Sequence, residues 1–316
     1  MRKTVKAIGF GRWQGTLSCL KSKNRMNSQV WLITGSSRGL GRALTEAVLA
    51  AGHKVVATAR KPEQLANLAA TYGGQLRTVA LDVTSPEQAE AAVALAVEAF
   101  GHLDLVVNNA GYGFIAAFEE MPEADFKGQI DTNFWGVVNV TRAALPVLRK
   151  QRSGHIIQIT SIGGRAGFAG LSGYHAAKFA VEGFSETIAQ EISAFGVKMS
   201  IVEPGGFRTE WATTSMVTVS PSADYQPSVG AMMGHLDNAV TQTPGDPNKA
   251  AQAILKLAAM ENPPLRLPLG TDALVLLRHT YAKALDDLEK YADITRSTNF
   301  DGLVISETGH AVLGTD

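Results

Sequence analysis

The chain has a single cysteine, Cys19, among its 316 residues, so a disulfide framework and a multi-cysteine zinc site are both excluded. Its seven histidines are scattered without the paired spacing of a metal site, and we expect no metal ion. Basic and acidic residues number 29 each, which gives no electrostatic reason to expect a nucleic-acid partner. No apolar run approaches the roughly 20 residues that cross a bilayer, so we expect no membrane span.

The balanced total charge conceals a basic leader. Seven lysines and arginines and no acidic residue precede Met26, which leaves 22 basic and 29 acidic residues in the rest of the chain. The leader lacks the compact apolar segment of a secretory signal. Its basic, acid-poor composition is typical of a mitochondrial transit peptide. Alternatively, the sequence begins at an upstream start codon, and Met26 is the true first residue. We favour the second reading, because a strand is expected directly after Met26. Residues 1–25 are therefore expected to be disordered or not native, and the protein to be cytoplasmic.

Short apolar runs alternate with helical patterns from Gln29 onward. The expected strands span 30–34, 54–60, 76–84, 103–111, 154–161, 197–205 and 263–270. They are apolar on both faces, as parallel strands covered by helices are. The alternation predicts an α/β fold with a single Rossmann-type, doubly wound parallel sheet of about seven strands, flanked by helices.

The helical patterns complete this organisation. They span 40–52, 61–73, 85–101, 126–151, 173–196, 246–260 and 271–295. The pattern breaks down between 205 and 247, where Ser, Thr, Pro, Gly and Met are frequent, and a loop of this length predicts a substrate lid. We expect one catalytic domain over 26–293 and a tail over 294–316.

A glycine-rich turn, TGxxxGxG, lies between the first strand and the first helix. Glycines permit a tight turn and a close backbone approach, and the following helix N-terminus favours an anion. The pattern favours a dinucleotide pyrophosphate, although a tight turn without a ligand has the same local signal. The residues expected to contact the dinucleotide here are Gly35, Ser37, Arg38, Gly39, Leu40 and Gly41.

Four further motifs follow in order. NNAG (108–111) ends the fourth strand, and Asn133 lies in the next helix. Ser161 ends the fifth strand, and Tyr174 and Lys178 follow in YHAAK. PG ends the sixth strand. Together with the glycine turn, this set resembles the short-chain dehydrogenase/reductase family, over roughly 26–266. PGGFRTEW and PPLRLPLG are similar to the subset related to 17β-hydroxysteroid dehydrogenases.

The resemblance implies a catalytic role for four of these residues. Tyr174 would exchange a proton with the oxygen of a secondary alcohol or ketone, and Ser161 would hydrogen-bond that oxygen. A lysine ammonium one helical turn away, with an oxidised nicotinamide, would lower the pKa of the phenol from about 10. Lys178 would also bind the nicotinamide ribose, and Asn133 would hold a water that passes protons to it. Taken alone, Ser161 could cap a turn and Asn133 could satisfy a buried backbone group.

The resemblance also extends the cofactor contacts. Asp82 and Val83 would face the adenine, although Asp82 could instead cap the helix that begins near Ser85. The other residues expected around the cofactor, besides Tyr174 and Lys178, are Asn109, Ala110, Gly111, Pro204, Gly205, Phe207 and Thr209.

The second strand indicates which dinucleotide is preferred. Sites for NAD usually place an acidic residue at its end, to bind the adenosine ribose. Here the strand ends in Arg60, and Arg38 lies in the glycine turn. Two guanidiniums in these loops would flank the 2′-phosphate of NADP(H), whereas separately each could be a solvated surface charge. We therefore expect NADP(H) to be preferred, with NAD(H) as a weaker cofactor.

Apolar residues near these motifs predict a hydrophobic substrate pocket, although such residues often form plain core. Phe114, Phe168 and Trp211 are the principal candidates, and a set with the same character is Ile115, Phe118, Leu171, Phe207, Met216, Met232 and Met233. The expected function is NADP(H)-dependent interconversion of a fairly hydrophobic alcohol and ketone or aldehyde. A non-catalytic redox sensor and a lyase, dehalogenase or isomerase on the same scaffold remain alternatives. The helices that carry Asn133 and Tyr174 are more apolar than one sheet face requires, and the resemblance implies that such helices pair between subunits. We therefore expect a homodimer or homotetramer, although the C-terminal segment could instead cover these helices in a monomer.

Overall fold

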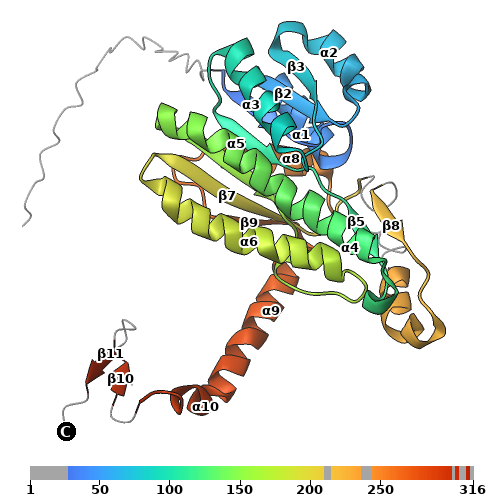
Figure 1. The fold of residues 1–316 in the computed structure, drawn as a ribbon, viewed down its shortest axis with the longest axis vertical. Coiled ribbons are helices and arrows are strands. Elements are labelled where there is room, and N and C mark those ends of the chain that lie inside the picture. Colours follow the sequence, from blue (N-terminus) through green and yellow to red (C-terminus); the bar gives the residue numbers. More distant parts are fainter. Residues whose placement is uncertain (1–27, 210–214, 236–242, 301–302, 306–310, 314–316) are drawn as a thin grey trace, which may run out of the picture.

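The computed structural model describes residues 28–209, 215–235, 243–300, 303–305 and 311–313. One parallel sheet has the strand order β3-β2-β1-β4-β6-β7-β9 (Figure 1). Its strands are β1 (Val30–Ile33), β2 (Lys54–Ala59), β3 (Leu76–Ala80), β4 (Leu105–Asn108), β6 (Gly154–Ile159), β7 (Val197–Pro204) and β9 (Arg266–Leu269). The predicted seven-stranded, doubly wound sheet is confirmed. The chain winds outward from β1 to β3 and returns to β4, so the switch point lies between β1 and β4.

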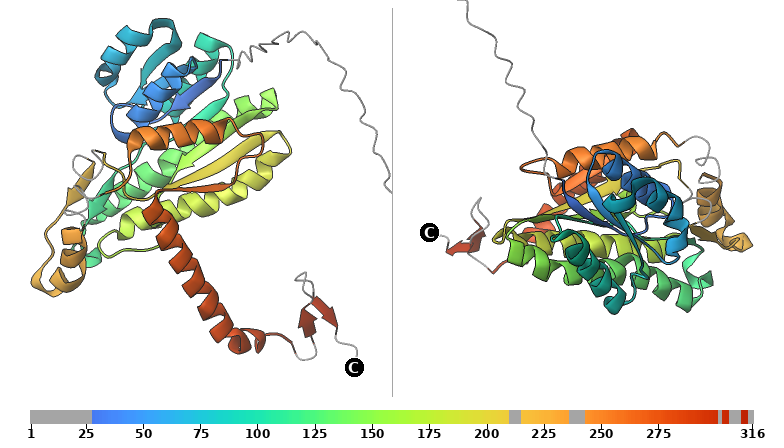
Figure 2. Two further views of the ribbon diagram at one scale, coloured as in Figure 1. Left: turned by 180° about the vertical axis from the view of Figure 1, so that it is seen from behind. Right: turned by 90° about the horizontal axis from the view of Figure 1, so that it is seen from above.

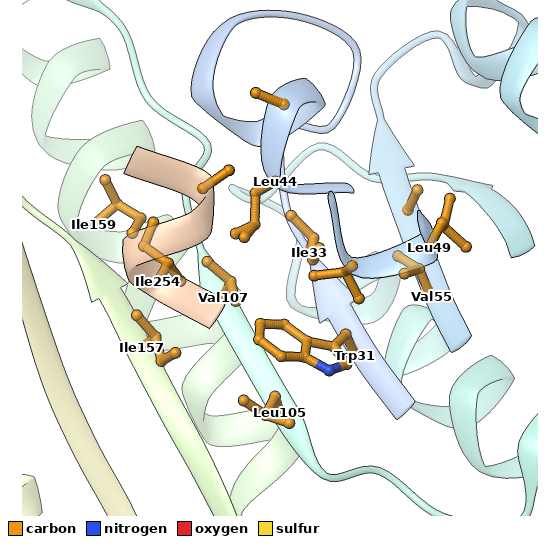
Figure 3. Packing of buried hydrophobic residues seen from close by; sticks show 14 of the residues in the cluster. Trp31, Ile33, Leu44, Leu49, Val55, Leu105, Val107, Ile157, Ile159 and Ile254 are labelled. Carbon is orange, nitrogen blue, oxygen red and sulfur yellow. The ribbon is translucent and has the colours of Figure 1, made fainter. Parts of the chain in front are cut away.

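Two layers of helices cover the sheet (Figure 2). One layer holds α1 (Gly39–Ala50), α2 (Ala66–Tyr72) and α8 (Pro247–Ala258), and the other holds α3 (Pro86–Phe100), α5 (Gly136–Gln151) and α6 (Ser172–Ser193). Successive strand residues point to opposite faces. Trp31 and Ile33 therefore pack toward the first layer, with Leu44 of α1 and Ile254 of α8 (Figure 3). Leu32 packs with the second layer.

Local signals in the sequence set several helix ends. The side chain of Ser85 caps α3 by accepting a hydrogen bond from the Gln88 amide at 3.2 Å. Gly52 and Gly101 follow α1 and α3 with φ of 87° and 86°, a conformation that favours glycine. These positions agree with the expected helix boundaries.

The long helix expected over 126–151 is divided. It consists of α4 (Glu123–Ile130), a five-residue π turn η4 (Asp131–Trp135) and α5, which continues through Pro146. The segment expected over 61–73 is likewise a 3₁₀ turn, η1 (Pro62–Leu65), followed by α2. A π turn changes the direction of the side chains that follow it, and Asn133 lies in this one.

The segment predicted as a lid has structure of its own. Strand β8 (Met216–Thr218) pairs in parallel with β5 (Gly113–Ile115), and the turns η6 (Ala223–Tyr225) and η7 (Gln226–Gly230) follow. Neither strand of this pair was predicted. The 3₁₀ turns η2 (Gly73–Gln75), η3 (Phe118–Glu120) and η5 (Ile162–Gly164) complete the described connections.

The C-terminal helix α9 (Thr271–Lys290) leaves the sheet edge at β9 and projects away from the body (Figures 1 and 2). It is followed by α10 (Ala292–Arg296) and a hairpin of β10 (Leu303–Ile305) and β11 (Ala311–Leu313), which the sequence did not predict. Among the described residues, no helix has the length and apolar character needed to span a membrane. The basic leader lies outside the described residues.

Candidate active site

A cavity of about 710 Å³ opens at the carboxyl ends of the strands, across the switch point between β1 and β4. This is where doubly wound sheets bind their ligands. The predicted site residues that line it are Gly35, Ser37, Arg38, Gly39, Leu40, Arg60, Asp82, Val83, Asn109, Ala110, Gly111, Asn133, Ser161, Tyr174, Lys178, Pro204, Gly205, Phe207 and Thr209. The motifs quoted from the sequence are therefore brought together around one cavity.

The glycine turn is fixed by its backbone conformation and by the end of β4. Gly35 and Gly39 have φ of 69° and 57°, in the left-handed region. Asn109 Nδ2 donates to the carbonyl oxygens of Thr34 at 2.9 Å and Gly35 at 3.2 Å. A Cβ at Gly41 would overlap the Gly35 oxygen and the Asn109 side chain. The absence of a side chain at Gly41 therefore allows α1 to lie close to the turn and to Asn109. The turn presents backbone amides at a helix N-terminus, which suits a pyrophosphate.

The two arginines predicted at the adenosine end lie in neighbouring loops. The Ser36 amide donates to the Thr58 oxygen at 2.8 Å, which holds the glycine turn beside the end of β2. Arg38 and Arg60 are exposed, and both line the cavity. Their charges are therefore accessible to an anionic group bound there.

Asp82 performs a local structural role as well as lining the cavity. Its Oδ1 accepts hydrogen bonds from the Thr84 amide at 3.0 Å and the Thr84 hydroxyl at 2.7 Å. The Asp82 carboxylate therefore shapes the turn before α3, but Ser85 and not Asp82 caps that helix. The adenine contact of Asp82 stays a prediction.

Tyr174 and Lys178 lie one turn apart on α6, next to Ser161. The Lys178 Nζ lies 5.7 Å from the centroid of the Tyr174 ring and donates to the Ile159 oxygen at 2.9 Å. Burial raises the pKa of Tyr174 to about 12, and a hydrogen bond with Ser161 opposes this rise. Burial therefore outweighs Ser161 in the protein without a bound cofactor, and the lowering expected from Lys178 together with an oxidised nicotinamide stays a prediction. Burial also lowers the pKa of Lys178 to about 8, although the nearby Glu182 opposes the fall.

Asn133 is fully buried, and its side chain holds the segment after NNAG. Its Nδ2 donates to the Tyr112 oxygen at 2.9 Å, and its Oδ1 accepts from the Tyr112 amide at 3.1 Å. A Cβ at Gly111 would lie 2.5 Å from that Oδ1. The amide of Asn133 therefore satisfies a backbone segment at the floor of the cavity, while the proton relay expected of Asn133 stays a prediction.

The predicted substrate residues are divided between two clusters. Phe168 packs against a buried cluster that includes Ile115, Leu171 and Tyr174. Phe114 lies in a separate cluster with Met121. The cause is strand β5, because neighbouring strand residues such as Phe114 and Ile115 point to opposite faces.

Other members of the apolar set are distributed in a similar way. Met216, Met232 and Met233 pack against the cluster at Tyr174, whereas Phe118 is 69% exposed. Trp211 lies outside the described residues. An apolar cluster that includes Tyr174 is therefore present, but with fewer aromatic members than the sequence indicated.

Some residues at the cavity carried no recognised signal in the sequence. Tyr112, Thr132, Ser215 and Thr243 line the cavity, and Asp272 of α9 accepts a hydrogen bond from the Gly206 amide at 2.7 Å. A Cβ at Gly205 would overlap this Asp272 carboxylate. Tyr112 follows NNAG directly and could have been inferred. Asp272 reaches the site from the far end of the chain, where no local pattern marks it.

Comparison with known proteins agrees with the geometry. Residues 29–218 match the family described as short chain dehydrogenase. Oxidoreductase BOA17 of Botryotinia fuckeliana is 49% identical over 247 residues, which cover 78% of this chain and 90% of that protein. The 3-ketodihydrosphingosine reductase of Bacteroides thetaiotaomicron is 35% identical over 269 residues, covering 84% of this chain and 97% of that protein.

Solved structures show the same fold with nicotinamide dinucleotides. A short-chain dehydrogenase from Streptomyces avermitilis has a TM-score of 0.80 and 39% identity, covering 86% of this chain and 99% of its own. A Burkholderia phymatum member in complex with NAD has a TM-score of 0.70 and 25% identity, covering 79% and 92%. ElxO with NADP bound has a TM-score of 0.65 and 26% identity, covering 78% and 99%. The chain therefore belongs to the short-chain dehydrogenase/reductase family and is an oxidoreductase that uses a nicotinamide dinucleotide.

Proposed function

We propose that this protein is an NADP(H)-dependent reductase of a hydrophobic ketone or aldehyde, and that it also catalyses the reverse oxidation. One observation carries the proposal: Ser161, Tyr174 and Lys178 line the same cavity as the glycine turn, and Tyr174 is only 6% exposed. A buried phenol at a dinucleotide site is placed to exchange a proton away from bulk water.

When bound in the cavity, a reduced nicotinamide would supply the hydride for the carbonyl carbon. The Tyr174 hydroxyl donates its proton to the carbonyl oxygen, and the Ser161 hydroxyl hydrogen-bonds that oxygen. A raised pKa of about 12 keeps Tyr174 protonated at neutral pH, which is the form that donates in the reducing direction. Lys178, with a pKa of about 8, is mostly ammonium at neutral pH, and it would bind the ribose hydroxyls and favour the phenolate that remains.

The preference for NADP(H) rests on Arg38 and Arg60. Both are exposed at the cavity, in loops joined by the hydrogen bond between Ser36 and Thr58. A guanidinium makes charge-assisted, bidentate hydrogen bonds with a phosphate, whereas NAD(H) offers only ribose hydroxyls there.

The apolar cluster beside Tyr174 supports a hydrophobic substrate. The resemblance of two sequence segments to the subset related to 17β-hydroxysteroid dehydrogenases also favours such a substrate. The similarity to a 3-ketodihydrosphingosine reductase supports the same class of long apolar ketones.

We further propose a homodimer or homotetramer. Trp135 and Phe179, which are 47% and 46% exposed, lie on the helical segments expected to pair. Light scattering that gives a single mass of 33.5 kDa would contradict an oligomer.

Turnover with a panel of ketones, followed at the absorbance of the reduced cofactor, tests the function. We expect NADPH consumption with long apolar ketones and a loss of about 10² to 10⁴ in kcat in Tyr174→Phe, with cofactor affinity retained. Phe keeps the ring and removes only the proton donor. Near-normal turnover in Tyr174→Phe would reject the assignment, and cofactor binding without turnover of any substrate would favour a redox sensor.

A further inference from the structure

Two buried glutamates and two partly exposed arginines lie behind Tyr174 and Lys178, and we call them the acid–guanidinium cluster: Glu182, Glu203, Arg165 and Arg266. Glu182 Oε2 lies 3.0 Å from Arg266 Nε and 3.7 Å from Arg165 Nη1. Glu203 Oε1 lies 3.5 Å from Arg165 Nη1 and 3.8 Å from Arg266 Nε. The glutamate side chains are only 5% and 2% exposed, so solvent screens these charges weakly.

The members of this cluster adjoin parts of the chain that line the cavity. Glu182 follows Lys178 by one turn of α6, and Arg165 follows Ser161 in the loop before that helix. Glu203 immediately precedes the turn at the end of β7 that lines the cavity. An ion-pair cluster placed elsewhere in the fold would stabilise the protein equally well, so its location calls for an explanation in terms of the site.

Two residues one turn apart on α6 bind two consecutive residues of the chain, the last residue of β6 and the residue that follows it. Lys178 Nζ donates to the Ile159 oxygen at 2.9 Å, and Thr160 Oγ1 donates to Glu182 Oε1 at 2.7 Å. The next residue along the chain is Ser161. We propose that Glu182 is a positioning residue, which fixes the chain leading into Ser161 against the helix that carries Tyr174 and Lys178. This inference rests on the function proposed above.

The charge of Glu182 also acts on its neighbours. Its carboxylate raises the pKa of Lys178 against the effect of burial, and burial together with Glu182 raises the pKa of Glu203 to about 7. Charged and titratable groups face Glu182 from several elements: Lys178 and Glu186 on its own helix, Arg165 after β6, Glu203 on β7, Arg266 on β9 and Tyr281 on α9. The Tyr281 ring centroid lies 5.1 Å from the Arg165 guanidinium carbon. Removal of the negative charge lets the pKa of Lys178 fall, which gives a readout that a purely structural role would not move.

Glu182→Gln keeps the shape of the side chain and removes its charge. With saturating NADPH we expect kcat to fall by about tenfold and the KM of the ketone to stay within about threefold, because the substrate wall is untouched. The alkaline limb of kcat against pH should move to lower pH, since Lys178 loses its ammonium earlier. Glu186→Gln is the matched control: Glu186 is one turn further along α6 and accepts from the same Arg266 at 2.8 Å, but it is exposed, so we expect wild-type kcat and pH profile.

Thr160→Val provides a second route, which decides the matter if Glu182→Gln does not fold. It keeps the volume and every charge and removes the hydroxyl, which donates to Glu182 Oε1 at 2.7 Å and lies 3.1 Å from the Val202 oxygen. We expect kcat to fall about threefold or more with the alkaline limb unmoved. Wild-type kcat in either folded variant, or an equal loss in Glu186→Gln, would overturn the positioning role. Tyr174→Phe separates the two proposals. If Tyr174→Phe is inactive while the Glu182 and Thr160 variants turn over normally, only the positioning role fails; turnover in Tyr174→Phe rejects the function itself.

Discussion

The dinucleotide part of the cavity, which we call the cofactor side, and the apolar cluster beside Tyr174, which we propose as the substrate side, are built in different ways. On the cofactor side, neighbouring strand ends of one sheet meet, and Asn109 ties them together by hydrogen bonds to the glycine turn. On the substrate side, the short pair β5 and β8 and the turn η7 bring together segments far apart in the chain, mainly through apolar contacts at Leu171, Tyr174 and Val229. Polar backbone geometry thus fixes one side, and side-chain packing fixes the other. Substitutions on the cofactor side should therefore cause large losses of cofactor binding, and substitutions on the substrate side should cause only small changes in the KM of the substrate.

The largest effect is expected where the two sides meet, at Lys178. Lys178→Met keeps the length of the buried side chain and removes the ammonium, so it loses the bond to Ile159 and the charge near Tyr174. We expect kcat/KM to fall by about 10³ and the Kd of NADPH to rise about tenfold. Stopped-flow and equilibrium binding measure the two quantities. If neither the barrier nor the cofactor Kd changes in a folded variant, the role of Lys178 is wrong.

The next effect tests the rigidity of the cofactor side. In Gly41→Ala the added Cβ meets the Gly35 oxygen and the Asn109 amide, which are backbone and a committed side chain. We expect a loss of about 1–3 kcal/mol in the free energy of unfolding and a cofactor Kd at least about tenfold higher. Denaturant unfolding and fluorescence titration measure these changes.

Gly183→Ala is the control for that substitution. Gly183 lies on an exposed position of α6, and a Cβ built there meets no described atom within 4 Å beyond the adjacent residues and the backbone of its own helix. Alanine should therefore stabilise the helix by roughly 0.5–1 kcal/mol and leave cofactor binding unchanged. A similar loss in both variants would mean that helix propensity, and not the close approach at the turn, is responsible.

The same contrast explains what the sequence could predict. The strands, the glycine turn and the Ser85 cap are encoded in neighbouring residues, so periodicity and composition were sufficient to place them. The β5–β8 pair joins residues about a hundred positions apart, and each strand has only three residues. Because that pair went unrecognised, the sequence grouped Phe114 with the other pocket candidates, whereas in the structure it packs in the separate cluster with Met121.

Contacts made by the C-terminal helix α9 could likewise not be predicted from the sequence. Asp272 holds the turn at Gly206 from 66 positions along the chain, and nothing in its local sequence marks it as part of the site. Burial raises the pKa of Tyr174 in the protein without a bound cofactor, and the sequence reveals the nearby lysine but not the depth of burial.

Cofactor choice gives a smaller and more specific effect. Wild type should prefer NADPH over NADH by at least about tenfold in kcat/KM, and Arg60→Asp should reverse this ratio by replacing an attraction to the 2′-phosphate with a repulsion. Steady-state kinetics with both cofactors measures it. Arg77→Asp, in which an arginine of β3 bonded to the Leu76 oxygen is changed, controls for general loss of positive charge. Equal efficiency in wild type, or an unchanged ratio in Arg60→Asp, would show that Arg60 does not read the phosphate.

The smallest effect should come from the substrate side, where packing alone is at stake. Val229→Ala removes two methyl groups from the cluster beside Tyr174, next to Gly170 and Ile115. We expect the KM of a long apolar ketone to rise about fourfold, with the cofactor Kd unchanged, because the loss of one apolar carbon contact costs about 0.8 kcal/mol. Phe114→Leu is the matched change in the separate cluster, and it should lower the free energy of unfolding by about 1 kcal/mol with no change in KM. If Phe114→Leu alters KM while Val229→Ala does not, the substrate binds on the opposite face of β5, and the division between the two clusters must be reversed.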